Sequence, residues 1–234
     1  MQTPIPALTT EQMREVDRLM EEDYGISLIQ MMENAGRNLA ALGRRTLGGA
    51  VAGKRVLALC GLGGNGGGGM VAARHLANWG ADVDVILAGD ESRLKAVPAH
   101  QWAIVRRLGL DVEDADPAAA DLVLDAMLGY GTRGDPRPPI ASWIKRANAS
   151  GTPVQALDAP SGLDTTSGRP GQPCIRAIAT MTLALPKTGL LSPEAADHVG
   201  ELYLADISVP PALYADMGLD LGAIFEKEAI LKLG

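Results

Sequence analysis

The chain has 234 residues, of which 47% are hydrophobic and 21% are charged. This length and balance exclude long disordered stretches and predict a single domain over residues 1–234. The net charge of −7 provides no positive field that could hold a nucleic-acid backbone. No apolar run approaches the roughly 20 residues of a membrane span, and residues 1–10 lack a basic and apolar leader. We therefore expect a cytoplasmic protein that binds neither nucleic acid nor membrane.

Two helices are predicted before the first strand. Thr9 and Gln12 have capping-box spacing, and the apolar residues after them recur at helical intervals up to Gly25. A second helical pattern begins at Ser27 and stops before Gly48.

Strands and helices alternate in the rest of the chain. The β-rich segments are residues 55–60, 83–87, 121–125, 154–157, 178–185 and 201–207. The helical segments are residues 70–79, 91–108, 140–149 and 223–233. This alternation predicts an α/β protein with a parallel, doubly wound sheet.

Ligands of such sheets bind beyond the carboxyl ends of the strands, so the segments that follow strands are the candidate sites. Residues 61–69 contain seven glycines and precede a predicted helix. Backbone amides there could approach a phosphate, or the segment could be only a tight turn. Residues 125–134 begin with Asp125, which could serve a ligand or could form a turn or helix cap.

Asp158 and Lys187 follow two later strands. A carboxylate at the mouth of a partly dry cleft can have its pKa raised toward neutrality, so Asp158 is the strongest candidate for a general acid or base. A plain Asx-turn is the alternative for Asp158. Lys187 could pair with Asp158, face a phosphate, or lie on the solvated surface.

Hard oxygen donors also recur after the strands, at Asn65, Asp125 and Ser161. They could hold a hard or monovalent cation, although their spacing does not choose the ion. The three histidines have no second ligand at metal spacing, and the chain lacks GxSxG and HExxH motifs. Serine-hydrolase and zinc-protease mechanisms therefore have no support.

Four segments in this order resemble the YjeF N-terminal domain family, the NAD(P)H-hydrate epimerases: the glycine run at 61–69, DAMLGYG at 125–131, DAPSG at 158–162 and PKTG at 186–189. The resemblance covers about residues 8–210. It implies a Rossmann-like, three-layer α/β/α fold, a homodimer, and an isomerase that interconverts the R and S epimers of hydrated NADH and NADPH. An ATP- or ADP-dependent dehydratase, expected here as a separate protein, would complete the repair of these damaged cofactors.

The resemblance also implies roles for individual positions. A potassium ion would be held by Asn65, Asp125 and Ser161, and Asp158 would be the acid/base residue with Lys187 beside it. The substrate would contact Asp158 and two glycine-rich segments, with Gly64, Asn65, Gly66, Gly67 and Gly68 in the first and Gly129, Tyr130, Gly131, Thr132, Arg133, Gly134 and Asp135 in the second.

The first of these segments departs from the family pattern GxGNNGGDG. This chain has Gly64 in place of the first Asn and Gly68 in place of the Asp. Two hypotheses follow. The presence of Asp158, Lys187 and the cation set favours an active epimerase, whereas the two missing side chains favour a catalytically weakened nucleotide-binding or scaffold module of the same fold.

Overall fold

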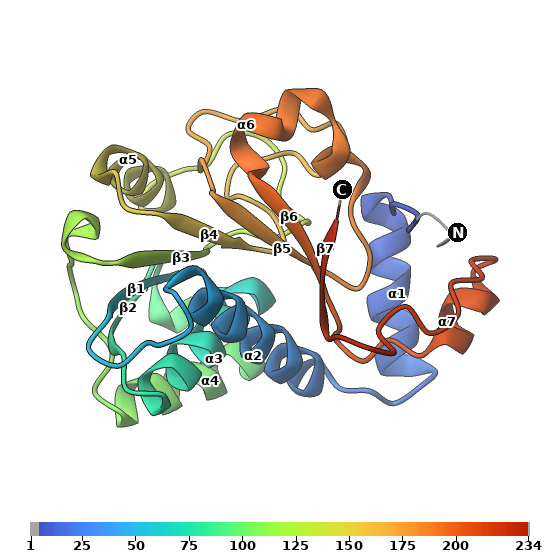
Figure 1. The fold of residues 1–234 in the computed structure, drawn as a ribbon, viewed down its shortest axis with the longest axis horizontal. Helices are drawn as coiled ribbons and strands as arrows, with labels where there is room; N and C mark the ends of the chain where they lie inside the picture. Colours follow the sequence, from blue (N-terminus) through green and yellow to red (C-terminus); the bar gives the residue numbers. More distant parts are fainter. Residues whose placement is uncertain (1–4, 234) are drawn as a thin grey trace.

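A seven-stranded sheet runs through the molecule in the computed structural model, which describes residues 5–233 (Figure 1). The strands, in spatial order, are β2 (Asp82–Leu87), β1 (Arg55–Cys60), β3 (Leu122–Ala126), β4 (Val154–Leu157), β5 (Ala179–Leu183), β6 (Glu201–Ala205) and β7 (Ile230–Leu233). Neighbouring strands are parallel except β6 and β7, which are antiparallel. The predicted doubly wound, mostly parallel sheet is confirmed.

Helices cover both faces of this sheet, which gives the three layers of a Rossmann-like fold (Figure 1). They are α1 (Thr10–Glu22), α2 (Leu28–Thr46), α3 (Gly64–Asn78), α4 (Ala96–Arg107), α5 (Ile140–Ser150), α6 (Ala196–Val199) and α7 (Pro211–Asp216). Alternate side chains of β1 enter different cores: Val56 and Ala58 pack with α2, α3 and α4, whereas Leu57 and Leu59 pack with α5. No helix within residues 5–233 is long and apolar enough to cross a membrane.

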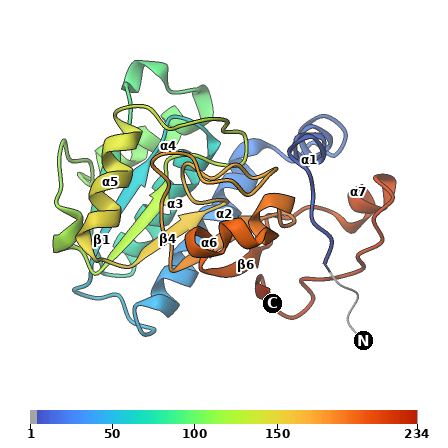
Figure 2. The same ribbon diagram turned by 90° about the horizontal axis from the view of Figure 1, so that it is seen from above.

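The N-terminal helices begin where the capping signals place them. The side-chain oxygens of Thr9 and Gln12 accept hydrogen bonds from the backbone N–H of the other residue, at 3.1 and 2.9 Å, so the predicted capping box is present. Helix α1 lies beside α7 (Figure 2), and its buried side chains share one core with the first half of α2, with α7 and with β6. A helix from the start of the chain thus lies beside the last strands.

Helix α3 begins at Gly64, six residues before the predicted start at Met70. Most of the predicted glycine loop is therefore the first turns of a helix. Glycine is a poor helix former, but tertiary packing overrides propensity here because the helix backbone lies against its neighbours. A Cβ atom on Gly69 would come within 2.5 Å of the Ala126 side chain, and one on Gly67 within 2.7 Å of Met32 Cε.

The C-terminal prediction is wrong: residues 230–233 form strand β7, and no helix occurs at 223–233. Leu231 and Leu233 pair with Leu204 and Leu202 of β6, so the apolar residues complete a sheet edge. A run of four residues has too few positions for its periodicity to distinguish strand from helix. The predicted helix over 91–108 is likewise two elements, a 3₁₀ turn (Glu91–Arg93) and α4.

The connections of the sheet reverse direction at β1, which pairs with β2 on one side and β3 on the other. Such a topological switch point leaves a crevice beyond the carboxyl ends of the two strands, where ligands of open α/β sheets bind. The residues that follow β1, β3 and β4 meet there.

Candidate functional site

A pocket of about 970 Å³ lies at this switch point. It is lined by α1, the start of α2, the start of α3, the segment after β2, the loop after β3, the end of β4, and Lys187. Small-molecule sites commonly occupy about 300–1,000 Å³, so this volume has room for a ligand as large as a dinucleotide.

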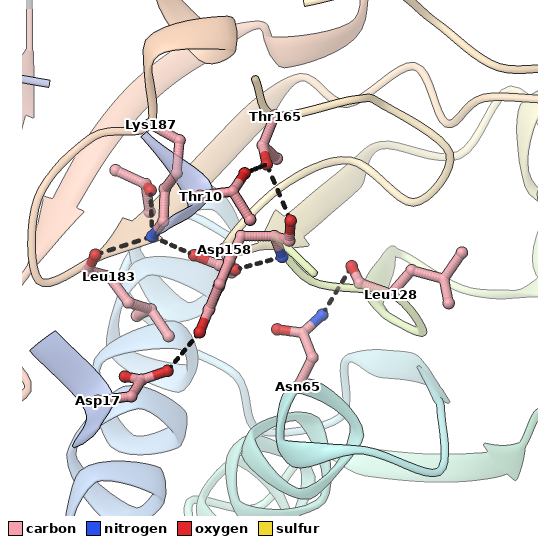
Figure 3. Close-up of polar contacts among 10 residues, drawn as sticks. Thr10, Asp17, Asn65, Leu128, Asp158, Thr165, Leu183 and Lys187 are labelled. Carbon is pink, nitrogen blue, oxygen red and sulfur yellow. Dashed lines mark hydrogen bonds and ion pairs between the residues drawn. The ribbon is translucent and has the colours of Figure 1, made fainter. Parts of the chain in front are cut away.

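Asp158 and Lys187 form a buried ion pair in this pocket (Figure 3). Lys187 Nζ donates to Asp158 Oδ1 at 2.5 Å, and also to Thr182 Oγ1 at 3.2 Å and the Leu183 carbonyl at 2.9 Å. The exposed fractions are 3% for Asp158 and 0% for Lys187. Of the three roles considered for Lys187, the structure selects pairing with Asp158.

The backbone of Asp158 has φ +65°, in the left-handed region that non-glycine residues seldom adopt. Its N–H donates to the Met181 carbonyl at 2.7 Å, which fixes the residue against β5. Such strain costs about 1–3 kcal/mol and concentrates at functional sites. The simple Asx-turn is not what this residue forms, because its side chain bonds Lys187 and Tyr130, which are distant in sequence.

Tyr130 connects the loop after β3 to the ion pair and to α1. Its N–H donates to Asp158 Oδ2 at 2.8 Å, and its hydroxyl donates to Asp17 Oδ2 at 2.5 Å. The Lys187 ammonium lies 5.6 Å from the centre of the Tyr130 ring. Burial raises the pKa of the Asp17 carboxyl and of the Tyr130 phenol.

Asp125 and Ser161 are in direct contact, and Leu128 links them to Asn65. Asp125 Oδ1 accepts from the Ser161 hydroxyl at 2.6 Å, and Asp125 Oδ2 accepts from the Ser161 N–H at 2.7 Å. Leu128 joins Asn65 to this pair: its carbonyl accepts from Asn65 Nδ2 at 3.0 Å, and its N–H donates to Ser161 Oγ at 2.9 Å. Asp125 is completely buried, and burial raises its pKa to about 6.

The loop after β3 lies at the pocket over its whole predicted range, with Gly129, Tyr130, Gly131, Thr132, Arg133, Gly134 and Asp135 among the lining residues. The N–H groups of Gly131, Arg133 and Gly134 have no acceptor among residues 5–233. Free amides in such a loop can bind an anion. A Cβ atom on Gly129 would lie 3.1 Å from Asp158 Oδ2 and 3.4 Å from the Asn65 side chain, so this glycine brings both residues close to the loop.

The first glycine segment is divided between two environments. Gly64, Asn65 and Gly68 line the pocket. Gly66 and Gly67 do not line it: a Cβ atom on Gly66 would meet Gly61, and one on Gly67 would meet Met32. The structure thus brings Gly64, Asn65 and Gly68 to the site and leaves Gly66 and Gly67 in the packing behind it.

Sequence reasoning missed the contribution of α1. Asp17 lies between Val16 and Met20 on the buried side of this helix, and a carboxylate within an apolar helical stripe was the available signal. It also missed the basic side chains that line the pocket: Arg14, Arg93, Lys95 and Arg137. These belong to segments where no motif marks them.

The fold and the pocket define a Rossmann-like α/β protein with a large pocket at the topological switch point. The pattern of the family described as "YjeF-related protein N-terminus" matches residues 28–189. The chain belongs to this family.

Individual relatives agree with this assignment. The chain is 45% identical over 218 residues to a protein of Dehalogenimonas lykanthroporepellens named "NAD(P)H-hydrate epimerase", which covers 92% of this chain and 87% of that protein. It is 38% identical to the "Bifunctional NAD(P)H-hydrate repair enzyme Nnr" of Moorella thermoacetica, covering 89% of this chain but 41% of that protein. The crystal structure of yeast YNL200c has the same fold, with a TM-score of 0.82 at 23% identity over 98% of this chain and 100% of that one.

Proposed function

We propose that this chain is an NAD(P)H-hydrate epimerase, an isomerase that interconverts the R and S epimers of hydrated NADH and NADPH. The observation that carries the proposal is the Asp158–Lys187 pair, buried in the switch-point pocket and bonded to Tyr130 of the loop after β3. The 45% identity to a protein named for this activity supports it.

The residues of the pocket suit the parts of this substrate. Free amides of the loop after β3, with Arg133, would bind the phosphate groups. Asp158 would exchange a proton with the ring that carries the added water, and Lys187 would hold its carboxylate in place. Gly64, Asn65 and Gly68 would contact the substrate from the start of α3.

We propose potassium as the cofactor, held by Asn65, Asp125 and Ser161. The donor set fits a cation because Asp125 is a fully buried carboxylate that forms no ion pair with a basic side chain of residues 5–233. A buried charge without a partner is costly, and a bound cation would offset that cost. When bound, the ion would supply a positive charge beside Leu128 at the pocket wall. Within the described residues, no group of three or more His, Cys, Asp or Glu could hold a metal ion by itself.

Potassium should therefore stabilise the protein more than sodium does. A ligand that binds only the folded state raises the free energy of unfolding by RT ln(1 + [L]/Kd), about 2.7 kcal/mol at 100 times Kd. Melting temperatures in KCl and NaCl at matched ionic strength measure this difference, with Asp125→Asn as the variant that should abolish it. Equal melting temperatures over a saturating range would contradict the potassium site.

The direct test of the function is epimerisation of a purified epimer of hydrated NADH, followed by chromatographic separation of the two epimers. The wild type should interconvert them faster than the uncatalysed reaction. Gly64 and Gly68 favour the second candidate, a nucleotide-binding module, because they leave two pocket positions without polar side chains. Saturable nucleotide binding by a wild type that does not epimerise would support that alternative.

The proposed partner activity is a dehydratase in a separate protein. The bifunctional relatives support the pairing of two repair activities, and this chain covers 41% of two of them. We further propose a homodimer in the cytoplasm, for which light scattering after gel filtration is the test of the oligomeric state.

A further inference from the structure

Asp17 is a second carboxyl group at the pocket. It lies on α1, and its Oδ2 accepts the hydrogen bond from the Tyr130 hydroxyl, on the side of the pocket that also carries Asp158 and Lys187 (Figure 3). Among residues 5–233, no donor bonds its other oxygen, Oδ1. That oxygen is available to a ligand or to a proton.

The two carboxyl groups have different neighbours. Asp158 pairs with the buried ammonium of Lys187, whereas Asp17 is bonded only to a neutral phenol. Burial raises the pKa of Asp17, and the nearby charge of Asp158 raises it further. The Tyr130 hydrogen bond and the charge of Lys187 lower it, without reversing the direction. The charged and titratable groups around Asp17 and Tyr130 are Arg14, Glu21, Asp158 and Lys187.

Building on the epimerase function proposed above, we propose that Asp17 is the second proton-transfer residue of the site, an acid that works with Asp158 as the base. Two carboxyl groups placed in environments that favour different protonation states allow one site to do acid and base chemistry at the same pH. In this site, α1 supplies the acid and the end of β4 supplies the base.

The chemistry of the substrate requires both roles. Hydration of the dihydronicotinamide ring places a hydroxyl on the carbon next to the ring nitrogen. Asp158 takes the hydroxyl proton, the C–O bond becomes a carbonyl, and the C–N bond breaks with its electron pair moving to the nitrogen. Asp17 gives its proton to that nitrogen. Rotation about the adjacent C–C bond and the reverse proton transfers close the ring on the other face, so that no proton is consumed overall.

This role has a specific pH dependence. Asp17 must carry a proton before the ring opens, so kcat should fall as the pH rises above the folded-state pKa of Asp17. The Tyr130 hydrogen bond lowers that pKa. Tyr130→Phe should therefore move the alkaline limb of the profile to higher pH, and Asp17→Asn should remove the limb.

The experiment measures kcat, KM, the pH profile and the melting temperature of the wild type, Asp17→Asn and Tyr130→Phe. Asp17→Asn keeps the shape of the side chain and an oxygen that accepts from Tyr130, and it should lower kcat by about 10² to 10⁴ with KM changed only a few-fold. Glu15→Gln is the matched control, because Glu15 is a carboxylate on the same helix that pairs with Arg18 outside the pocket. It should match the wild type.

The outcomes separate this role from the proposed function. An active wild type matched by Asp17→Asn in kcat and pH profile overturns the role of Asp17 alone, whereas a wild type that does not epimerise overturns the proposed function and this role with it. If Tyr130→Phe lowers kcat as much as Asp17→Asn does, the phenol of Tyr130 is the proton donor, and the role proposed for Asp17 is overturned. If Asp17→Asn does not fold, the alkaline limb of the kcat profile of Tyr130→Phe is the test. A shift of this limb to higher pH supports the role of Asp17, and an unchanged limb overturns it.

Discussion

The two glycine-rich segments of the pocket, at the start of α3 and after β3, have similar composition and different physical roles. In α3, the glycines allow a helix backbone to approach its neighbours, since Cβ atoms on Gly66, Gly67 and Gly69 would meet other atoms within 3 Å. In the loop after β3, Cβ atoms on Gly131 and Gly134 would meet nothing within 4 Å. Gly66, Gly67 and Gly69 therefore serve helix packing, whereas Gly131 and Gly134 belong to open backbone.

This difference shows that glycine content alone does not identify a phosphate-binding loop. A glycine in a closely packed helix is needed because a side chain has no space. A glycine in an open loop leaves the backbone amides uncovered by a side chain and permits backbone conformations that other residues rarely adopt. The two cases respond differently to substitution, and the following predictions use that response.

The largest effect is expected at Asp158, whose carboxylate accepts a hydrogen bond from the loop after β3. Asp158→Asn should lower kcat by about 10² to 10⁴, because the base is lost. It should also cost about 3–5 kcal/mol of stability, because Lys187 is left as a buried charge without a partner. Epimerisation rates and urea unfolding measure the two effects separately.

The double variant Asp158→Asn/Lys187→Met is the control for that experiment. Removing both charges should restore most of the stability, since a buried pair can be replaced by apolar groups at little cost. Activity should stay low. A double variant with wild-type turnover would show that Asp158 is a structural anchor and not the base.

Gly66→Ala tests the packed segment. Alanine is the better helix former by about 1 kcal/mol, but its Cβ would lie 2.7 Å from the backbone nitrogen of Gly61 and closer still to its carbonyl. The clash with a backbone that cannot move should cost about 3 kcal/mol or more in urea unfolding. Stability equal to the wild type would mean that α3 is not packed at this position as described.

Gly64→Asn/Gly68→Asp tests the positions of this segment that line the pocket. The nearest neighbour of a Cβ atom on Gly64 is Leu28 Cδ1 at 3.9 Å, and that of Gly68 is Leu157 Cδ2 at 2.8 Å, the end of a buried side chain that must shift to admit it. Restoring the family side chains should raise kcat/KM by about tenfold, the equivalent of one hydrogen bond of about 1.4 kcal/mol. An unchanged value in a folded, active variant would show that the chain binds substrate without these contacts.

The smallest stability effect is expected at Gly131. Its φ is not positive and a Cβ atom there would meet nothing within 4 Å, so Gly131→Ala should change the free energy of unfolding by less than about 0.5 kcal/mol. Comparison with Gly66→Ala under the same conditions gives the contrast between the segments directly. Equal losses of stability in Gly131→Ala and Gly66→Ala would contradict the difference between the packed helix and the open loop.

The sequence by itself determined the elements that rest on local signals. The capping box of Thr9, the limits of β1 and β4, and the α/β alternation were all predictable, because caps and apolar periodicity act within a few residues. The motif order also placed Asp158, Lys187 and the loop after β3 in one site, since parallel strands bring their carboxyl ends to one edge.

Only the tertiary structure decided which side chains meet. The helical start of α3 depends on packing against Met32 and Ala126, and β7 depends on pairing with β6, so neither could be recognised locally. Asp17 enters the site because α1 lies across its edge, a placement that no spacing within the helix specifies. Local sequence fixes conformations through short-range bonds and sterics, whereas contacts between distant segments depend on how the whole chain packs.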